Sequence, residues 1–201
     1  MSVVIGVLAL QGDVREHIEA VCKAGGHAIS VRTREELEAV DGLIIPGGES
    51  TTVGKLLERF GLMPVVRGMP ADNKPIFGTC TGMILLASDI EGSSQPRIGV
   101  MDILVRRNAF GRQVDSFEAD LPVHGIDGLP VRAVFIRAPF VSEVRPGVEV
   151  LAEFQGHPVM VREGNCLAAS FHPELTDDTR IHQYFLPLVT AAKIRREESN
   201  K

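Results

Sequence analysis

Short apolar runs alternate with amphipathic stretches through the first half of the chain. The run at 3–10 (VVIGVLAL) is apolar throughout, which is typical of a strand buried on both faces. A helical pattern follows at 13–26, with Asp13 as its predicted N-cap. Further strand-like runs lie at 27–32, 42–46 and 75–77, and Thr33 with Glu36 forms a predicted capping box. This alternation predicts an α/β fold with a mixed, mainly parallel central sheet and helices on both faces.

The pattern changes after about residue 98, where strand-like runs follow one another with little helix between them. These runs lie at 100–107, 131–139, 148–154, 157–163 and 166–171. They predict added strands on the same domain, partly antiparallel. A last helix is expected at 180–194, with Pro187 bending or breaking it, and 195–201 is expected to be a solvated tail. We therefore expect one domain over 1–190, with the helix end and tail at 191–201.

Composition narrows the class of protein. The 201 residues suit one large α/β domain, and the formal net charge of −5 does not favour nucleic acid or an acidic membrane as a partner. The N-terminal run is too short to span a bilayer and lacks a basic flank, so we interpret it as a buried strand. Three cysteines without a CxxC pair argue against a disulfide framework or a zinc ribbon. A reducing cytoplasm is the expected location.

One cysteine lies in a distinctive setting. In GTCTG, Gly78 and Gly82 flank Cys80 between the apolar run KPIF and the helical run MILLA. This is the spacing of a nucleophile elbow, a sharp strand-to-helix turn that requires small residues two positions away. The nearby helix N-terminus favours the thiolate. A buried cysteine in a glycine-rich turn remains the alternative. Cys22 and Cys166 have no such setting and are expected to be small core residues.

A thiolate nucleophile needs a base and a group that orients the base. Among the six histidines, His172 follows the buried run CLAASF and opens HPEL. In an extended segment residues i and i+2 point to the same side, so Glu174 is expected to reach its imidazole, with Pro173 preventing coiling. The other reading is a histidine at a strand end beside a surface glutamate. The presence of His172 and Glu174 in the same chain as the Cys80 elbow favours the catalytic interpretation.

A third element is the glycine pair in IIPGGEST at 44–51. Two glycines after a buried strand allow backbone N–H groups to converge on an oxyanion or a phosphate. With a cysteine nucleophile we prefer an oxyanion hole formed by the Gly47–Gly48 turn and the N–H of Thr81. A phosphate-binding turn capped by Ser50 and Thr51 is the alternative, although no lysine occupies the P-loop position.

The motifs PGGES, GTCTG and SFHPE, in this order, resemble the class I (triad) glutamine amidotransferases. The segments LALQGDVREH, RRNAFGRQVDSFEAD, VFIRAP and FHPELTDD narrow the resemblance to the glutaminase subunits of pyridoxal 5′-phosphate synthases, from about residue 4 to about residue 190. The resemblance implies a flavodoxin-like three-layer sandwich. It also implies hydrolysis of L-glutamine to glutamate and ammonia, with no cofactor and no metal.

The resemblance also implies roles for individual residues. Cys80 would attack the amide to form a thioester, His172 would protonate the ammonia and then activate water, and Glu174 would orient His172. The implied substrate-binding positions are Gly47, Gly48, Glu49, Ser50, Thr81, Arg107, Ile136 and Arg137. Thr81 departs from the alanine that many relatives carry, and we expect this to be tolerated because the oxyanion donor is a backbone N–H.

The implied partner is a barrel-shaped synthase subunit in a large hetero-oligomer, which combines ammonia with pentose and triose phosphates into pyridoxal 5′-phosphate. Because glycine peptides at 47 and 48 can flip easily, we expect the free chain to be a poor glutaminase that its partner activates. Two other functions stay open: another triad cysteine hydrolase, such as a γ-glutamyl hydrolase, and a catalytically silent regulatory module.

Overall fold

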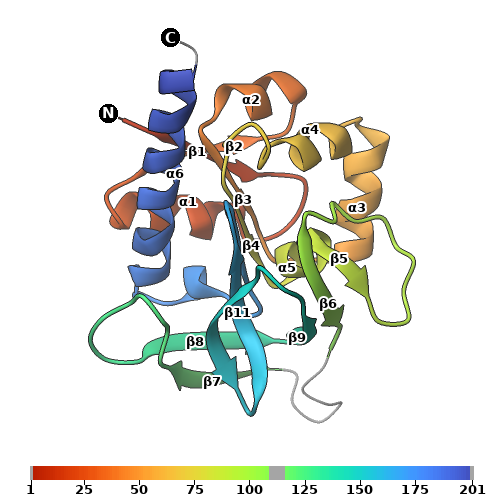
Figure 1. Ribbon diagram of the computed structural model, residues 1–201, viewed down its shortest axis with the longest axis vertical. Helices are drawn as coiled ribbons and strands as arrows, with labels where there is room; N and C mark the ends of the chain where they lie inside the picture. The colour runs from red at the N-terminus through yellow and green to blue at the C-terminus, as the bar shows by residue number, and fades with distance from the viewer. Residues whose placement is uncertain (1, 109–115, 200–201) are drawn as a thin grey trace.

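The computed structural model describes residues 2–108 and 116–199, and its centre is a seven-stranded sheet (Figure 1). Along the sheet the strands follow the order β10-β11-β12-β4-β3-β1-β2. Their bounds are β1 (Val4–Leu8), β2 (His27–Val31), β3 (Gly42–Ile45), β4 (Ile76–Thr79), β10 (Glu149–Phe154), β11 (His157–Glu163) and β12 (Cys166–Ala169). The five strands from β12 to β2 are parallel, whereas β11 pairs antiparallel with both β12 and β10. The mixed, mainly parallel sheet expected from the sequence is confirmed.

Helices cover both faces of this sheet (Figure 1). One face carries α1 (Val14–Lys23) and α6 (Arg180–Ser199), and the other carries α2 (Arg34–Ala39), α3 (Ser50–Arg59), α4 (Met63–Gly68) and α5 (Thr81–Leu86). Side chains of each strand alternate between the two cores: in β3, Leu43 and Ile45 face the α2–α5 side and Ile44 faces α1 and α6. The strands are buried on both faces, which explains their nearly continuous apolar runs.

Two smaller sheets adjoin the central one. β5 (Ala87–Ile90), β6 (Met101–Arg106) and β9 (Phe140–Val144) form one, and β7 (Ser116–Leu121) with β8 (Val131–Ile136) forms an antiparallel ribbon. The expectation of added, partly antiparallel strands is confirmed, although β5, β7 and β9 were not anticipated. Residues 109–115 of the long central motif lie outside the described residues.

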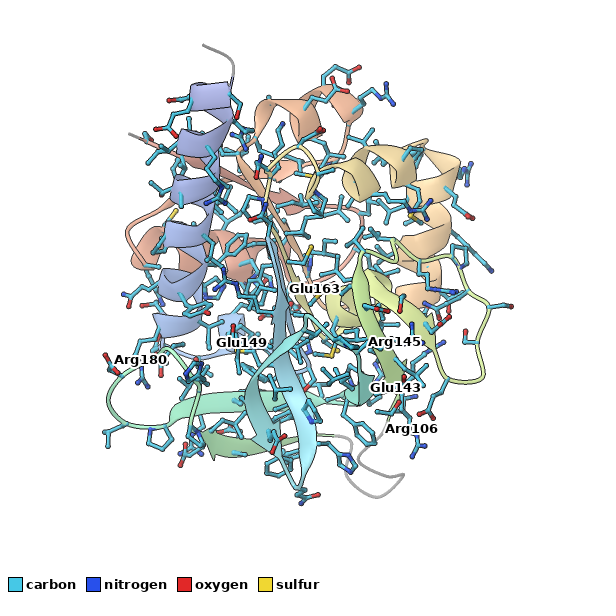
Figure 2. The ribbon with its side chains drawn as sticks, viewed as in Figure 1. Arg106, Glu143, Arg145, Glu149, Glu163 and Arg180 are labelled. Atoms are coloured by element: carbon cyan, nitrogen blue, oxygen red, sulfur yellow. The ribbon has the colours of Figure 1, made fainter. Side chains whose placement is uncertain are left out.

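Ion pairs join strands within the β5-β6-β9 sheet, and a hydrogen bond links this sheet to the central one. Figure 2 shows Arg145 beside Glu143, and the Nε–Oε1 distance is 3.3 Å. The same guanidinium lies 2.8 Å from Oδ1 of Asp102 on β6. The backbone N–H of Asp102 donates to Oε2 of Glu163 at 2.7 Å, which links β6 to β11 of the central sheet. This hydrogen bond attaches the small sheet at the end of β11 that lies level with Ile76, the first residue of β4.

The C-terminal helix differs from the sequence expectation. α6 runs through Pro187 as one helix and continues to Ser199, so a break at the proline is wrong and the helix extends five residues beyond its expected end, although Arg195, Glu198 and Ser199 are exposed. Arg196 Nη2 lies 2.6 Å from Oδ1 of Asp41 and Lys193 Nζ lies 3.0 Å from Oδ2. These two ion pairs hold the last turns against the sheet. In the part of the chain that the structure describes, no helix has an apolar stretch suited to crossing a membrane.

The strand order brings three distant segments to one edge. β4 is flanked by β3 and β12, all parallel, with Gly78 opposite Ile45 and Thr79 opposite Ala169. The segments that follow these three strands therefore emerge side by side at the carboxyl edge of the sheet, where open α/β sheets bind ligands. Cys80, the Gly47–Gly48 turn and the His172 segment all lie in them.

Candidate active site

Cys80 occupies a sharp turn between β4 and α5. Its φ is 47° and its ψ is −98°, a conformation that residues other than glycine rarely adopt. A Cβ on Gly78 would lie 2.5 Å from the carbonyl carbon of Gly82, and a Cβ on Gly82 would overlap the carbonyl oxygen of Ile45. Both glycines are required because the chain crosses itself closely here. The predicted geometry of a nucleophile elbow is confirmed.

The sulfur is buried between the elbow and β8. Cys80 is 8% exposed, and its Sγ lies 3.9 Å from the carbonyl oxygen of Ile136 at the end of β8. The backbone N–H of His172 donates to the carbonyl of Val134 in the same strand at 2.8 Å. β8 therefore borders both the nucleophile and the histidine, and it fixes the width of the site between them.

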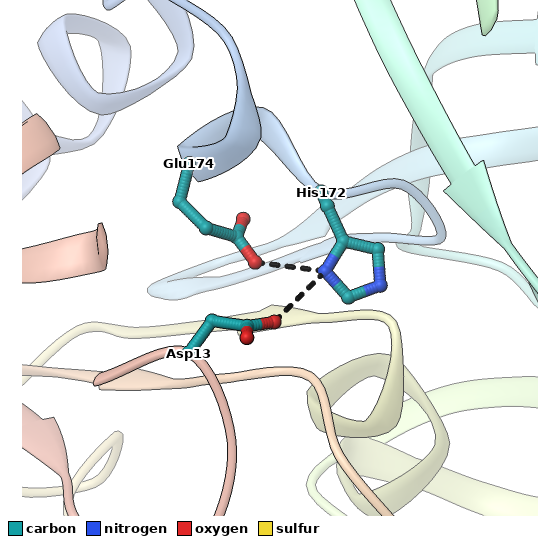
Figure 3. A group of neighbouring side chains, drawn as sticks. All are labelled: Asp13, His172 and Glu174. Atoms are coloured by element: carbon teal, nitrogen blue, oxygen red, sulfur yellow. Dashed lines mark hydrogen bonds and ion pairs between the residues drawn. The ribbon is translucent and has the colours of Figure 1, made fainter. Parts of the chain in front are cut away.

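His172 and Glu174 form the predicted pair. Nδ1 of His172 lies 2.8 Å from Oε1 of Glu174, and both residues are buried (Figure 3). The sequence predicted an extended segment here, but Pro173–Leu175 forms the short 3-10 helix η1. The contact survives because a 3-10 turn brings the glutamate side chain back over the residue that precedes the turn. The pairing was predicted correctly and the backbone conformation was wrong.

Asp13 brings a second carboxylate to the same imidazole. Its Oδ2 lies 3.5 Å from Nδ1 of His172, so both carboxylates converge on the same ring nitrogen (Figure 3). Asp13 occupies the N-cap position of α1, as predicted, but its side chain accepts no capping hydrogen bond from the helix. The carboxylate faces the site instead of the helix end.

The electrostatics of the pair favour a charged imidazole. Burial lowers the pKa of His172, but hydrogen bonds with Asp13, Cys80 and Glu174 outweigh it and raise that pKa to about 12. Burial raises the pKa of Glu174, and the hydrogen bond from His172 opposes this rise. Imidazole is the stronger base of the two, so we place the shared proton on Nδ1 and leave Glu174 ionised. Nε2 of His172 is then left for the thiol.

The same three side chains are the candidate metal group among the described residues. Ligand atoms of Asp13, His172 and Glu174 lie within 4.8 Å of one another. The 2.8 Å between Nδ1 and Oε1 is the length of a charge-assisted hydrogen bond, so a proton on Nδ1 accounts for the arrangement.

The glycine turn packs directly against the pair formed by His172 and Glu174. A side chain at Gly47 would overlap the ring of His172, and the carbonyl of Gly47 lies against Gly12. The carbonyl of Gly48 accepts a 2.6 Å hydrogen bond from the hydroxyl of Thr81. The N–H of Thr81 lies in the first turn of α5, where backbone donors have no partner within the helix. The turn and this N–H are thus brought together as predicted.

A second group of expected binding residues surrounds the start of α3. Glu49 is the N-cap of α3 and accepts from the N–H groups of Thr51 at 3.3 Å and Thr52 at 2.7 Å. Arg107 Nη2 lies 3.6 Å from Oε1 of Glu49. Burial raises the pKa of Glu49, but these hydrogen bonds and Arg107 outweigh it, so the pKa is lowered and the carboxylate stays ionised.

Gln95 joins this second group and was missed by sequence reasoning. Its Oε1 accepts from Ser50 at 3.3 Å, from Thr51 at 3.2 Å and from Nη1 of Arg107 at 2.8 Å. Nothing in the local stretch EGSSQPR signals this role, because it depends on a loop folding over α3. The structure therefore brings together Glu49, Ser50 and Arg107 through a residue that no motif contains.

Ile136 and Arg137 lie at the end of β8. Ile136 offers its carbonyl to the sulfur, whereas the side chain of Arg137 is exposed and its φ is 44°. The expected binding positions thus form two groups. One surrounds Cys80 and contains Gly47, Gly48, Thr81 and Ile136, and the other contains Glu49, Ser50 and Arg107.

The N-terminal motif LALQGDVREH supplies further residues that sequence reasoning did not place at the site. Gln11 Oε1 accepts from the N–H of Glu49 at 3.2 Å, and Asp13 approaches His172. His17, one turn into α1, is fully buried with its Nε2 3.3 Å from Oε2 of Glu174. The signal was available in the motif itself, whose polar residues follow the first strand of the sheet.

The other two cysteines differ from each other. Cys166 is buried in β12, as expected, and burial with nearby Glu163 raises its pKa to about 12. Cys22 is exposed on α1, so its assignment to the core is wrong. Cys22 lies on the solvent-facing side of the amphipathic helix α1, and the short apolar pattern around it did not indicate which side of the helix is buried.

Comparisons with known proteins agree with this site. The model of the SNO glutamine amidotransferase family matches residues 7–191. The chain is 57% identical over 185 residues to pyridoxal 5′-phosphate synthase subunit PdxT of Carboxydothermus hydrogenoformans, covering 92% of this chain and 97% of that protein. It is 56% identical over 190 residues to the subunit of the same name from Streptomyces coelicolor, covering 94% of each.

Solved structures give the same result. A crystal structure of a glutamine amidotransferase matches with a TM-score of 0.88 and 53% identity, covering 92% of this chain and 98% of that one. PurLQS from Thermotoga maritima matches with a TM-score of 0.66 at 16% identity, covering 97% and 99%, and this likeness concerns the fold alone. With its elbow cysteine, its buried histidine–glutamate pair and a family match over nearly its whole length, the chain belongs to the SNO glutamine amidotransferase family.

Proposed function

We propose that this chain hydrolyses L-glutamine to L-glutamate and ammonia and delivers the ammonia to a synthase subunit that makes pyridoxal 5′-phosphate. The observation that carries the chemistry is the 2.8 Å contact between His172 Nδ1 and Glu174 Oε1, beside a cysteine held at φ 47°. An oriented base next to a nucleophile on an elbow is the arrangement that covalent acyl transfer needs.

The reaction begins at the sulfur. His172 holds the thiol proton on Nε2 as the imidazolium that its raised pKa favours, and the Cys80 thiolate forms an S–C bond to the γ-carboxamide carbon of glutamine. The oxygen becomes an oxyanion, for which the N–H of Thr81 and the Gly47–Gly48 turn are the nearby donors. When the tetrahedral species collapses, the C–N bond breaks and His172 protonates the departing ammonia.

The second half returns the enzyme to its starting state. Neutral His172 removes a proton from water, whose oxygen attacks the γ-glutamyl thioester. The C–S bond breaks, glutamate leaves, and the Cys80 thiolate is restored beside the His172 imidazolium. Throughout both halves Glu174 keeps a proton on Nδ1, so the nitrogen facing the substrate is always the one that exchanges protons.

The group around Gln95 supports recognition of the amino acid end of glutamine. Arg107 is a fixed guanidinium 2.8 Å from Gln95 Oε1, and Glu49 is an ionised carboxylate 3.6 Å from Arg107. A guanidinium suits an α-carboxylate and a carboxylate suits an α-ammonium. We assign this group, with Ser50 and Arg137, to the α-amino acid end, and the group around Cys80 to the amide end.

The partner is proposed from the relatives, which are named as subunits of pyridoxal 5′-phosphate synthase. A subunit that releases ammonia needs an acceptor, and we propose a barrel-shaped synthase subunit that combines ammonia with pentose and triose phosphates in a large hetero-oligomer. All three cysteines are free, which supports a reducing, cytoplasmic location.

The test is an assay of glutamate and ammonia release from L-glutamine, with the purified chain alone and with a synthase subunit. Formation of pyridoxal 5′-phosphate from glutamine, pentose phosphate and triose phosphate is expected only with both chains. A parallel panel of γ-glutamyl peptides is expected to give no turnover. Turnover of the peptides in preference to glutamine would instead identify a γ-glutamyl hydrolase, and absence of any turnover with the partner present would contradict the proposal.

A further inference from the structure

Two fully buried histidines lie behind Glu174, on the side away from Cys80. His17 on α1 is 0% exposed and His182 on α6 is 1% exposed. His17 Nε2 lies 3.3 Å from Oε2 of Glu174 and 3.0 Å from the hydroxyl of Thr79, and its Nδ1 lies 3.1 Å from Nε2 of His182. Figure 3 shows that one oxygen of Glu174 points away from His172. This oxygen, Oε2, has no hydrogen-bond partner among the described residues, and Nε2 of His17 is its close contact.

Hydrogen bonding selects one tautomer for each ring. If His17 carried its proton on Nδ1, its Nε2 lone pair would face the carboxylate of Glu174, which is repulsive. His182 would then accept at Nε2 and carry its proton on Nδ1, where the structure offers no hydrogen-bond partner among the described residues. A buried donor without an acceptor is costly. The alternative places protons on Nε2 of both rings and leaves only a lone pair unpartnered on His182.

The burial of both rings is consistent with neutral imidazoles. Burial, His182 and His172 together lower the pKa of His17 well below its ordinary value, and burial lowers the pKa of His182 to about 4. A neutral ring has one donor and one acceptor, so His182 donates to His17, and His17 donates in turn through its Nε2–H to Thr79, beside Glu174.

We propose that His17 is a positioning residue of the catalytic triad: its Nε2–H, which is hydrogen-bonded to Thr79, also lies 3.3 Å from the outer oxygen of Glu174 and stabilises that carboxylate, and His182 fixes the tautomer that makes this possible. The proposal rests on the proposed glutaminase function. The hydrogen bonds run from His182 to His17, from His17 to Thr79, and from His172 to Oε1 of Glu174. Oε2 of Glu174 has no hydrogen-bond partner of its own among the described residues, so the nearby N–H of His17 is the dipole that helps to keep this buried carboxylate ionised.

The groups that face Glu174 decide the direction of its response to pH. His172 and His17 contact its two oxygens, and Asp13 is the other nearby charge and disfavours ionisation. Thr79 of β4 shares the His17 nitrogen, and His182 of α6 lies behind it. Burial and Asp13 both raise the pKa of Glu174. Without the N–H of His17, only His172 opposes this rise. Protonation of Glu174 is then expected at higher pH, and a protonated Glu174 cannot hold the imidazolium of His172.

The first experiment compares His17→Leu with His17→Gln in the complex with the synthase subunit. The amide of Gln can place an N–H near the position of Nε2, whereas Leu fills the space without a donor. We expect the acid limb of the pH profile of kcat/KM to move up by about one pH unit in His17→Leu, because Oε2 of Glu174 loses the N–H dipole beside it. His17→Gln should keep the limb within about 0.3 pH unit of wild type, which is below that shift.

The matched control is His124→Gln, because His124 is an exposed histidine paired with Glu149 far from the triad. Its pH profile should match wild type. If His17→Leu lowers activity equally at all pH values, as a packing defect does, the positioning role is wrong. The same holds if His17→Gln shifts the acid limb as much as His17→Leu.

A second measurement needs neither catalysis nor a stable Leu variant. Long-range ¹H–¹⁵N NMR of the chain labelled in its histidines is expected to show both His17 and His182 as neutral Nε2–H tautomers. In Glu174→Gln the amide NH₂ faces His17, so both rings should change together to Nδ1–H. Nδ1–H tautomers in wild type, or rings that do not respond to Glu174→Gln, would overturn the proposal even where glutaminase activity is normal. Failure of the glutaminase assay with the expected tautomers would instead count against the proposed function.

Discussion

The hydroxyl of Thr81 donates a 2.6 Å hydrogen bond to the carbonyl oxygen of Gly48. The next N–H in the turn, that of Glu49, donates to Gln11 Oε1 at 3.2 Å. The peptide between Gly48 and Glu49 is thus held at both ends, once from the first turn of the nucleophile helix and once from the N-terminal motif. The freedom of the glycine turn is confined to the peptide between Gly47 and Gly48.

The hydrogen bond from the Thr81 hydroxyl to Gly48 predicts a modest catalytic role for the Thr81 side chain. Thr81→Ala removes the donor but keeps the backbone N–H, so kcat should fall about three- to tenfold with KM little changed, the cost of one neutral hydrogen bond. Thr81→Ser should restore most of the loss. Steady-state glutamine hydrolysis with the synthase subunit present measures both, and equal activity of Thr81→Ala and wild type would show that the contact is dispensable.

Cys80 should be the thiol that glutamine-directed reagents label. A glutamine-analogue electrophile reaches the sulfur through substrate binding, so peptide mass spectrometry should find the adduct on Cys80 and not on buried Cys166. Because Cys22 is exposed, a small non-specific alkylating agent should label it as well. Excess L-glutamine should protect Cys80 from the analogue and leave Cys22 labelling unchanged. An analogue adduct at Cys22, or glutaminase activity in Cys80→Ala, would contradict the assignment.

Glu174→Gln should be less damaging than Cys80→Ala. Glu174 orients His172 and forms no bond to substrate, and loss of an orienting group costs less than loss of the nucleophile. We expect measurable residual turnover in Glu174→Gln, none in Cys80→Ala, and similar glutamine binding in both. Single-turnover kinetics and calorimetric binding separate these quantities. Two variants that bind glutamine normally and are equally inactive would rule out a purely orienting role.

Asp41 should make stability depend on acid pH. Burial raises its pKa, but the N–H of Val4, Lys193 and Arg196 outweigh it, so the folded pKa lies below the unfolded one. Its contribution is therefore present above the unfolded value, about 4, and is lost as pH falls through the folded value. At pH 7 Asp41→Asn should lower Tm by about 2–8 °C, and the difference should narrow below about pH 4.

The control for this prediction is Asp120→Asn. Asp120 pairs with Arg132 at 3.0 Å, but both side chains are more than half exposed. Exposed pairs contribute little to stability, so its Tm should stay close to that of wild type at all pH values. A Tm difference for Asp41→Asn that is independent of pH would point to packing instead of charge.

The isolated chain should be a poor glutaminase that the synthase subunit activates. If the Gly47–Gly48 peptide turns its N–H away from the oxyanion, the loss is about 10²–10³ in rate, as for removal of one oxyanion donor. A partner surface that fixes the turn recovers this factor. Glutamine turnover by the chain alone and with saturating synthase subunit gives the ratio directly, and equal rates would exclude the switch while leaving the triad intact.

Local sequence was sufficient to predict the elbow, the capping box and most strands of the central sheet. The GTCTG turn needs Gly78 because a Cβ there would collide with the backbone of Gly82, a requirement that acts over a few residues. Thr33 and Glu36 form their capping box within one helical turn. Short-range steric requirements and hydrogen bonds of this kind depend on nearby residues, so the local sequence is enough to predict them. The pairing of His172 with Glu174 is similarly local.

The remaining features arise from strand order, which no local pattern specifies. β12 pairs with β4 although nearly ninety residues separate Cys166 from Ile76, and this pairing alone sets the histidine beside the cysteine. The same packing turns Asp13 toward His172, buries His17 against Glu174 and leaves Cys22 exposed. In sequence terms His17 and Cys22 are merely two positions on one amphipathic helix. Only the placement of α1 against the carboxyl edge of the sheet decides which of them enters the site, because burial and charge pairing are properties of the assembled surfaces.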